Sequence, residues 1–486
     1  MSLRLYNSLT RSIEPLEPLE AGVVRMYTCG PTVYDRAHIG NFRTFLWEDL
    51  LRRVLRWQGI EVVQVMNLTD VDDRTIAAAL ERGLTLQEVT APVIQQFFDD
   101  WRTLGLEPVE HNPRATEHID GMIALIEALE ARGLTYLSDG SVYFAIERLG
   151  DYGRLAGLDP ESMHSTGQAT GDEEYDKNDP RDFVLWKGGL RAEEGDVAVW
   201  DSPWGPGRPG WHLECSAMAM ALLGETLDIH TGGVDNLFPH HTNEIAQSEG
   251  ATGVPFARHW MHAAHLLVEG RKMSKSLGNC FTVPELVERG HAPSTLRYLM
   301  LSGHYRAQLN FTFAGLEAAE RSVRRLYECR ERLRAATGLA TSGRDHLGSA
   351  ASEARAGFEA ALEDDLNVSE ALAAVFGLVR EGNHCLDRAS PAAPGGVDDA
   401  LGVLDDFERV FGVLGLRDRE EREQVADLSI EVEQLIAERV RARASRDFAR
   451  ADEIRDRLLS RGVVLEDTPG GTRWKLGGTP STTSTE

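Results

Sequence analysis

The feature that most constrains the fold is a strand, a loop, a helix and a second strand in direct succession near the N-terminus. Val23 to Tyr27 is an apolar run that predicts a buried strand, and the breaker-rich residues 28–32 follow it. Apolar residues then recur at helical spacing from Phe42 to Leu55, and Ile60 to Leu68 predicts the next strand. This unit is typical of a parallel sheet that binds ligands at the carboxyl ends of its strands.

The rest of the chain predicts an α/β fold of several domains. Residues 75–135 look mostly helical, residues 136–210 are rich in Gly, Pro, Asp and Trp, and linker-like stretches at 336–352 and 390–398 interrupt a helical region. Near the end, the sequence predicts a charged pair of helices. The first helix has Val432, Leu435, Ile436 and Val440 on one face, and the second has Phe448, Ala451, Ile454 and Leu458. We therefore predict a Rossmann-like parallel-sheet domain in two halves, at 1–118 and 210–258, with an inserted domain at 119–209 between them. A loop-rich region at 259–314 and a helical bundle at 315–416 follow. The chain is then expected to form a small C-terminal domain at 425–476 and a disordered tail at 477–486.

Charge and cysteine usage exclude several classes of protein. The chain of 486 residues carries a formal charge of −26, so a non-specific polyanion binder is excluded and any nucleic acid must meet a local basic patch. Five scattered cysteines argue against a disulfide framework and suit a reducing cytoplasm. The first residues carry no apolar signal region, and no run approaches the roughly 18 apolar residues of a membrane span.

Two motifs indicate that the protein binds a nucleoside triphosphate. His38-Ile39-Gly40-Asn41 stands at the expected helix start, where backbone amides attract anions and a glycine permits close approach. Taken alone, this motif favours a loop histidine that caps a helix. Lys272-Met273-Ser274-Lys275-Ser276 is flanked by glycines, and two lysines there can neutralise phosphates whose charge shifts to a leaving pyrophosphate. Together the motifs resemble the signature pair of class I aminoacyl-tRNA synthetases.

A third group of residues predicts a metal site. Cys29 ends the first strand, Cys215 lies in Gly210-Trp211-His212-Leu213-Glu214-Cys215-Ser216, and His240 and Glu244 share one face if they lie on a helix. Two sulfurs, an imidazole and a carboxylate form a plausible tetrahedral zinc set. The alternatives are cysteines that act as small buried hydrophobes and a surface His/Glu contact, and spacing alone leaves the metal open.

The order of these segments resembles the cysteinyl-tRNA synthetase family along nearly the whole chain. The likeness rests on residues 27–35, Asp182 to Lys187, Gly210 to Ser216, Phe238 to His241 and Lys272 to Ser276. It implies that Cys29, Cys215, His240 and Glu244 bind one zinc ion that takes the substrate's sulfur as a thiolate, with His241 as the alternative histidine. It further implies that Trp211 packs against the bound cysteine, Thr69 contacts it and Asp235 accepts from the ribose.

The resemblance also implies a two-step reaction. Cysteine attacks the α-phosphate of ATP, accompanied by Mg²⁺, and the adenylate then passes to the terminal adenosine of tRNA(Cys). We expect His38, with Gly40 and a lesser contact from Asn41, at the α-phosphate, and Lys272 and Lys275 at the leaving phosphates. The class I motif commonly ends in a second histidine, whose place Asn41 takes; asparagine cannot carry a positive charge, and the resemblance implies that the cysteinyl family tolerates this variation. Ala263-Ala264-His265 also departs from the common pattern, and nothing in the sequence explains it.

RNA binding is expected at the C-terminal end. Residues 438–461 hold eight arginines against five acidic residues, and Trp474 could stack on an unpaired base. On these residues alone, a solvated helical hairpin with i,i+4 pairs is the favoured explanation of the arginines. The resemblance favours an anticodon-binding domain and a monomer.

Three other functions compete with this interpretation. A cysteine ligase of small-thiol biosynthesis would not need the region at 430–476. A non-catalytic tRNA-binding paralogue would need neither the lysine loop nor the metal ligands. A zinc hydrolase lacks the usual His-Glu-x-x-His helix. Cys280, Cys329 and Cys385 are expected to be structural.

Overall fold

The protein is described by a computed structural model covering residues 3–158, 179, 181–188, 197–274, 277–337, 346–387, 394–460, 463–468 and 471–476. Lys275 and the tail at 477–486, for which the sequence made predictions, lie outside these residues. The chain divides into two compact units, Met1–Leu416 and Arg417–Glu486. None of the helices in the described part of the chain combines the length and apolar character needed to cross a bilayer.

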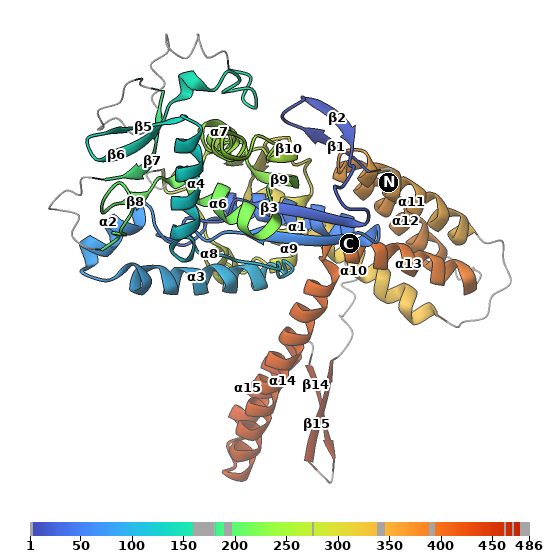
Figure 1. The fold of residues 1–486 in the computed structure, drawn as a ribbon. Helices are drawn as coiled ribbons and strands as arrows, with labels where there is room; N and C mark the ends of the chain where they lie inside the picture. Colours follow the sequence, from blue (N-terminus) through green and yellow to red (C-terminus); the bar gives the residue numbers. More distant parts are fainter. Residues whose placement is uncertain are drawn as a thin grey trace. The chain divides into compact units, whose positions relative to one another are not determined.

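The centre of the first unit is a four-stranded, all-parallel sheet in the order β10-β9-β3-β4 (Figure 1). Its strands are β3 (Val23–Thr28), β4 (Glu61–Met66), β9 (Leu227–Gly233) and β10 (Ala257–Ala263). Helix α1 (Ile39–Trp57) connects β3 to β4, which confirms the predicted unit. Because β9 pairs with the opposite edge of β3, the strand order reverses between β3 and β9, and parallel sheets bind ligands at such a reversal.

Helices cover both faces of this sheet. Alternate residues of a strand point to opposite faces, so Met26 and Tyr27 of β3 enter different hydrophobic clusters. Helices α1 and α9 (Pro293–Leu301) lie on one side of the sheet (Figure 1). On the other side lie α4 (Ile119–Ala131), α6 (Trp211–Leu223) and α7 (Thr242–Thr252).

The predicted insertion forms a separate antiparallel sheet in the order β5-β6-β7-β8. The helices α2 (Asp73–Arg82) and α3 (Leu86–Thr103) precede it, and its strands are β5 (Thr135–Ser138), β6 (Ser141–Phe144), β7 (Phe183–Lys187) and β8 (Arg208–Pro209). Gly210 joins this sheet to α6: its N–H donates to the Leu185 carbonyl over 2.8 Å, and a Cβ on Gly210 would lie 2.2 Å from the Val184 carbonyl oxygen. The inserted sheet therefore fixes where α6 begins.

Smaller elements frame the sheet and lead into a helical bundle. They are β1 (Arg4–Asn7), β2 (Ser12–Pro15), β11 (Leu266–Val268), β12 (Arg271–Lys272), β13 (Leu309–Phe311), α8 (Val283–Glu288), α10 (Phe313–Ala336), α11 (His346–Glu363), α12 (Val368–Asp387) and α13 (Pro394–Phe411). The predicted linkers at 336–352 and 390–398 are too long, since α11 already begins at His346 and α13 at Pro394. The error arose because these segments, rich in small residues, resemble linkers, although alanine favours a helix.

The second unit contains a helical hairpin followed by two paired strands. Its elements are α14 (Leu414–Ala444), α15 (Phe448–Ser460), β14 (Val463–Thr468) and β15 (Gly471–Leu476), of which α14 begins just ahead of the division. Val432, Leu435 and Ile436 pack with Ile454 and Leu458, as predicted. The prediction was wrong for Val440 and Phe448, which are 52% and 61% exposed. Val440 lies near the end of α14 and Phe448 is the first residue of α15, beyond the packed part of the hairpin.

A buried ion pair joins three helices of the first unit. Arg297 of α9 is fully buried, donates to Asp49 of α1 and also satisfies the carbonyls of Leu104 and Phe411. Although burial opposes ionisation of Asp49, Arg297 and a second arginine hold the pKa of this carboxyl below its usual value.

Replacing Arg297 with leucine would leave the Leu104 and Phe411 carbonyls without this donor, and Asp49 would keep only Arg53 as an ion-pair partner. We expect Arg297→Leu to destabilise the unit by roughly 3 kcal/mol, the lower end for breaking a buried pair, because the remaining arginine still compensates the carboxylate. The control Arg409→Leu removes an arginine whose side chain is 70% exposed and should change stability by less than about 0.5 kcal/mol. Denaturant unfolding measures both effects, and equal midpoints for the two variants would contradict the prediction.

Candidate active site

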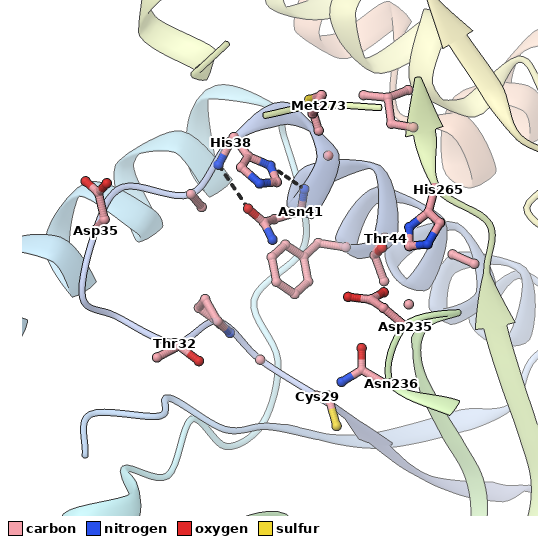
Figure 2. Close-up of a pocket in the computed structure, with 18 of the residues that line it drawn as sticks. Cys29, Thr32, Asp35, His38, Asn41, Thr44, Asp235, Asn236, His265 and Met273 are labelled. Atoms are coloured by element: carbon pink, nitrogen blue, oxygen red, sulfur yellow. Dashed lines mark hydrogen bonds between the residues drawn. The ribbon is translucent and has the colours of Figure 1, made fainter. Parts of the chain in front are cut away.

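A cavity of about 480 Å³ opens at the carboxyl ends of β3 and β9, where the strand order reverses (Figure 2). Cys29 leads in from β3, while Asp235 and Asn236 reach it from the turn after β9. The start of α1 supplies His38, and Figure 2 shows His38 and Asn41 across the cavity from Asp235. The topology thus assembles the cavity from segments that lie far apart in the sequence.

His38 and Asn41 hold each other in place at the first turn of α1. The His38 ring Nδ1 accepts from the Asn41 backbone N–H over 3.2 Å, and Asn41 Oδ1 accepts from the His38 N–H over 3.0 Å. A neutral imidazole whose Nδ1 accepts carries its proton on Nε2. The capping role that the sequence left open is therefore real, and it also fixes the tautomer of a histidine that lines the cavity.

Met273 of the second motif lies over the same turn. A Cβ on Gly40 would stand only 2.1 Å from Cε of Met273, so the missing side chain of Gly40 is what lets Met273 approach the helix. Lys272 lines the cavity beside Met273, and its partner Lys275 is outside the described residues. The structure therefore brings the two motifs of the sequence together through Met273, which the sequence did not single out.

The four predicted metal ligands converge beside the cavity, which Cys29 also lines. One atom each from Cys29, Cys215, His240 and Glu244 lies within 4.8 Å of the others, and all four residues are buried. The two sulfurs are 3.9 Å apart, and His240 Nε2 is 3.1 Å from Glu244 Oε1. Cys29 follows β3, Cys215 lies one turn into α6, and His240 and Glu244 face each other across the start of α7.

The electrostatics of this group separate the two cysteines. Burial raises the pKa of Cys29. A hydrogen bond from the Cys29 thiol, assisted by His240, lowers the pKa of Cys215 to about 6 even though burial opposes it. Burial also acts against a charged His240, but Glu244 and Cys215 outweigh it and raise the pKa of His240. The group therefore favours one thiolate next to a histidine.

Three further histidines surround the four residues. His230 Nε2 lies 2.8 Å from Glu244 Oε2, and His212 Nδ1 lies 2.7 Å from His240 Nδ1. His241 contacts Cys29 on one side, at 3.3 Å, and the His262 ring on the other, at 2.8 Å. None of these outer contacts was predicted.

An alternative set of ligand atoms overlaps the first. It consists of Cys29, His230, His241 and Glu244, and it contains the histidine that the sequence kept as second choice. In this set both imidazoles already have partners: His230 contacts Glu244, and His241 contacts His262. Burial and the neighbouring histidines lower the pKa of His241 well below its usual value.

The other three predicted substrate contacts differ in position: two line the cavity, and one lies behind its wall. Trp211 is 44% exposed, lines the cavity and stacks on His240 with ring centroids 4.7 Å apart. Asp235 lines the cavity as well. Thr69 is buried behind the wall, and its N–H donates to the Pro31 carbonyl over 3.1 Å.

Several cavity residues escaped the sequence analysis. Thr44 lies four residues after Gly40 on α1, so helical spacing could have placed it in the cavity. Ala264 and His265, which belong to the segment that the sequence left unexplained, also line it. Asn236 lines it as well, and no pattern in the sequence distinguishes it from an ordinary turn residue.

Comparisons with known proteins agree along the chain. The family model described as the catalytic domain of class I (C) tRNA synthetases matches residues 15–321, a DALR domain matches 357–416, and a cysteinyl-tRNA ligase anticodon-binding domain matches 425–474. A cysteine–tRNA ligase of Solibacter usitatus is 48% identical over 98% of this chain and 100% of its own length. One of Protochlamydia amoebophila is 45% identical over 97% and 98%.

A solved structure shows the same fold at low identity. Methionyl-tRNA synthetase of Mycobacterium tuberculosis, in complex with methionyl-adenylate, superposes with a TM-score of 0.59 at 14% identity. The match covers 81% of this chain and 90% of that one.

Proposed function

Because the chain belongs to the cysteine–tRNA ligase family of class I aminoacyl-tRNA synthetases, we propose how its own residues divide the work of joining cysteine to tRNA. The observation that carries the proposal is the convergence of Cys29, Cys215, His240 and Glu244 beside a cavity that also holds His38 and Lys272. The cysteine end and the ATP end of the reaction thus share one opening.

The four converging residues fit zinc. Two sulfurs, one imidazole nitrogen and one carboxylate oxygen form a donor set that zinc binds tetrahedrally, and a thiol with a pKa of about 6 is largely ionised at neutral pH. Zinc held by these residues would supply a Lewis acid with affinity for sulfur, which would favour the substrate's thiolate over the hard hydroxyl of serine. We prefer this set to the one with His230 and His241, because it leaves those histidines as partners of Glu244 and Cys29.

The remaining residues orient the substrates. We assign the His38 Nε2–H and the first turn of α1 to the α-phosphate, with Asn41 as a lesser contact beside Gly40. Lys272 and Lys275 neutralise the leaving phosphates, and Mg²⁺ accompanies ATP. Asp235 accepts from the ribose hydroxyls, Trp211 closes over the bound cysteine, and Thr69 holds the Pro31 loop in place.

The second unit is assigned to the anticodon of tRNA(Cys). Several of its arginines are engaged within the hairpin, since Arg450 pairs with Glu438 and Glu453, and Arg457 pairs with Glu431. These pairs reduce the local positive charge, so we assign the phosphate contacts to the end of the hairpin, where Arg446 lies in the turn. We further propose that the protein acts as a cytoplasmic monomer, for which light scattering should give a mass of 53.7 kDa.

Transfer of radiolabelled cysteine to total tRNA, with ATP and magnesium, tests the proposal. We expect acid-stable, RNase-sensitive label that falls after chelation and returns with added Zn²⁺, because the thiol contact is obligatory. Label that is unaffected by complete zinc removal would overturn the metal assignment. If cysteine-dependent ATP–pyrophosphate exchange occurs but tRNA is not labelled, the acceptor is not tRNA. That result would favour the alternative function, a cysteine ligase of small-thiol biosynthesis.

A further inference from the structure

The contact between His212 and His240 imposes a condition on both rings. Their Nδ1 atoms lie 2.7 Å apart, which is hydrogen-bond distance, and both side chains are buried. Two facing nitrogens can form such a bond only when one carries a hydrogen and the other presents a lone pair. The pair therefore admits one donor and one acceptor at this contact.

The direction of the bond follows from the other side of His240. Its Nε2 faces the cluster of candidate ligands, 3.1 Å from Glu244 Oε1. A histidine that binds a metal through Nε2 must keep its hydrogen on Nδ1, and metal-bound histidines commonly donate that hydrogen to an outer acceptor. His212 Nδ1 is the group in place to accept it.

His212 is itself held from outside the cluster. It is the second residue of α6, whose start is fixed to the inserted sheet through Gly210. Its ring meets Phe183 of β7 nearly edge-on, with centroids 6.2 Å apart and planes at 89°. The acceptor for His240 is thus positioned by a part of the fold that contributes no ligand of its own.

We propose that His212 is a positioning residue that accepts the Nδ1 hydrogen of His240 and so directs the Nε2 lone pair of that ring toward the metal. The proposal rests on the proposed zinc role of His240. It also assigns a task to the inserted region, which sets the orientation of the metal site through Phe183, Gly210 and His212.

Two substitutions separate the hydrogen bond from simple packing. His212→Leu fills the space but offers no acceptor, whereas the amide oxygen of His212→Asn can take the place of Nδ1. His259→Leu is the matched control, because His259 is a buried histidine of the same unit whose ring nitrogens have no hydrogen-bond partner among the described residues. Circular dichroism and thermal unfolding of each full-length variant monitor folding.

The readouts are zinc affinity, measured by competition with a chromophoric chelator, and the absorption spectrum of the Co²⁺-substituted protein. We expect His212→Leu to bind zinc about 10–100-fold more weakly and to shift the cobalt bands, the usual result of losing an outer partner. His212→Asn should remain close to the parent protein, and His259→Leu should match it.

Three outcomes would overturn the proposal. His212→Leu could bind zinc as tightly as the parent with the same cobalt spectrum, or His212→Asn and His212→Leu could lose affinity equally, which would mean packing alone. A parent protein that binds no zinc would refute the proposed metal site itself. That failure is visible before any variant is made, so it cannot be confused with the other two.

Discussion

Cysteine-dependent ATP–pyrophosphate exchange is expected to fall by about four orders of magnitude when Cys215 is replaced by alanine, the range set by an obligatory polar contact. Cys215 is the cysteine whose pKa is lowered to about 6, and its sulfur lies 3.9 Å from that of Cys29. Its loss removes a sulfur from the metal set and the hydrogen-bond partner of Cys29. Bound zinc per chain, measured by atomic absorption, should fall in parallel.

The matched control for this experiment is Cys329→Ala. Cys329 is buried in α10, within the bundle core, and burial raises the pKa of its thiol to about 11. This substitution removes an inert thiol, so zinc content and exchange should remain near the parent values. If Cys215→Ala retained one zinc per chain and normal exchange, the proposed ligand set would be wrong.

Replacing Gly30 with alanine is expected to disrupt the site by crowding rather than by loss of chemistry. A Cβ at this position would lie 1.7 Å from the Asn67 carbonyl oxygen, and the Gly30 N–H already donates to Asn67 Oδ1 over 2.8 Å. The loops after β3 and β4 would have to separate, and Cys29 would move with the first of them. We expect a stability loss of roughly 3 kcal/mol, at the upper end for overpacking.

The same displacement should reduce catalysis in any molecules that remain folded. A misplacement of about 1 Å can cost on the order of 100-fold in rate, so transfer of labelled cysteine should fall by at least that factor. Gly121→Ala is the control: nothing lies within 4 Å of its added Cβ in α4, and alanine should stabilise that helix by up to about 1 kcal/mol. Normal transfer and an unchanged thermal midpoint in Gly30→Ala would contradict the crowding argument.

The parts of the fold that the sequence predicted well are those set by local periodicity. Apolar residues recur at helical spacing from Phe42 to Leu55, and an apolar segment of strand length stands on each side of them. The pattern alone therefore predicts β3, α1 and β4. The pairing of β9 with β3 depends on contacts between residues some 200 positions apart, which no local pattern records.

The candidate site shows the same division. Motif order and residue type were enough to nominate Cys29, Cys215, His240 and Glu244, whereas their convergence depends on the strand order. The outer histidines could not be predicted, because His212 and His230 look like ordinary residues of a helix and a strand until the fold brings them to their partners. The exposure of Val440 and Phe448 could not be predicted for a similar reason. Periodicity identifies the apolar face of a helix, but it does not show how far along the helix a partner covers that face.

The hydrophobic cluster on the α1 side of the parallel sheet determines how this chain can be shortened. That cluster runs without a break from Met26 through α9 and α10 to Phe411 of α13, so the bundle and the sheet share one interior. Deleting everything after β13 would remove α13 from α1, expose part of this apolar interior and invite aggregation. A cut near Leu416 would spare that interior, which makes it the natural end point for a minimal fragment that activates cysteine without reading an anticodon.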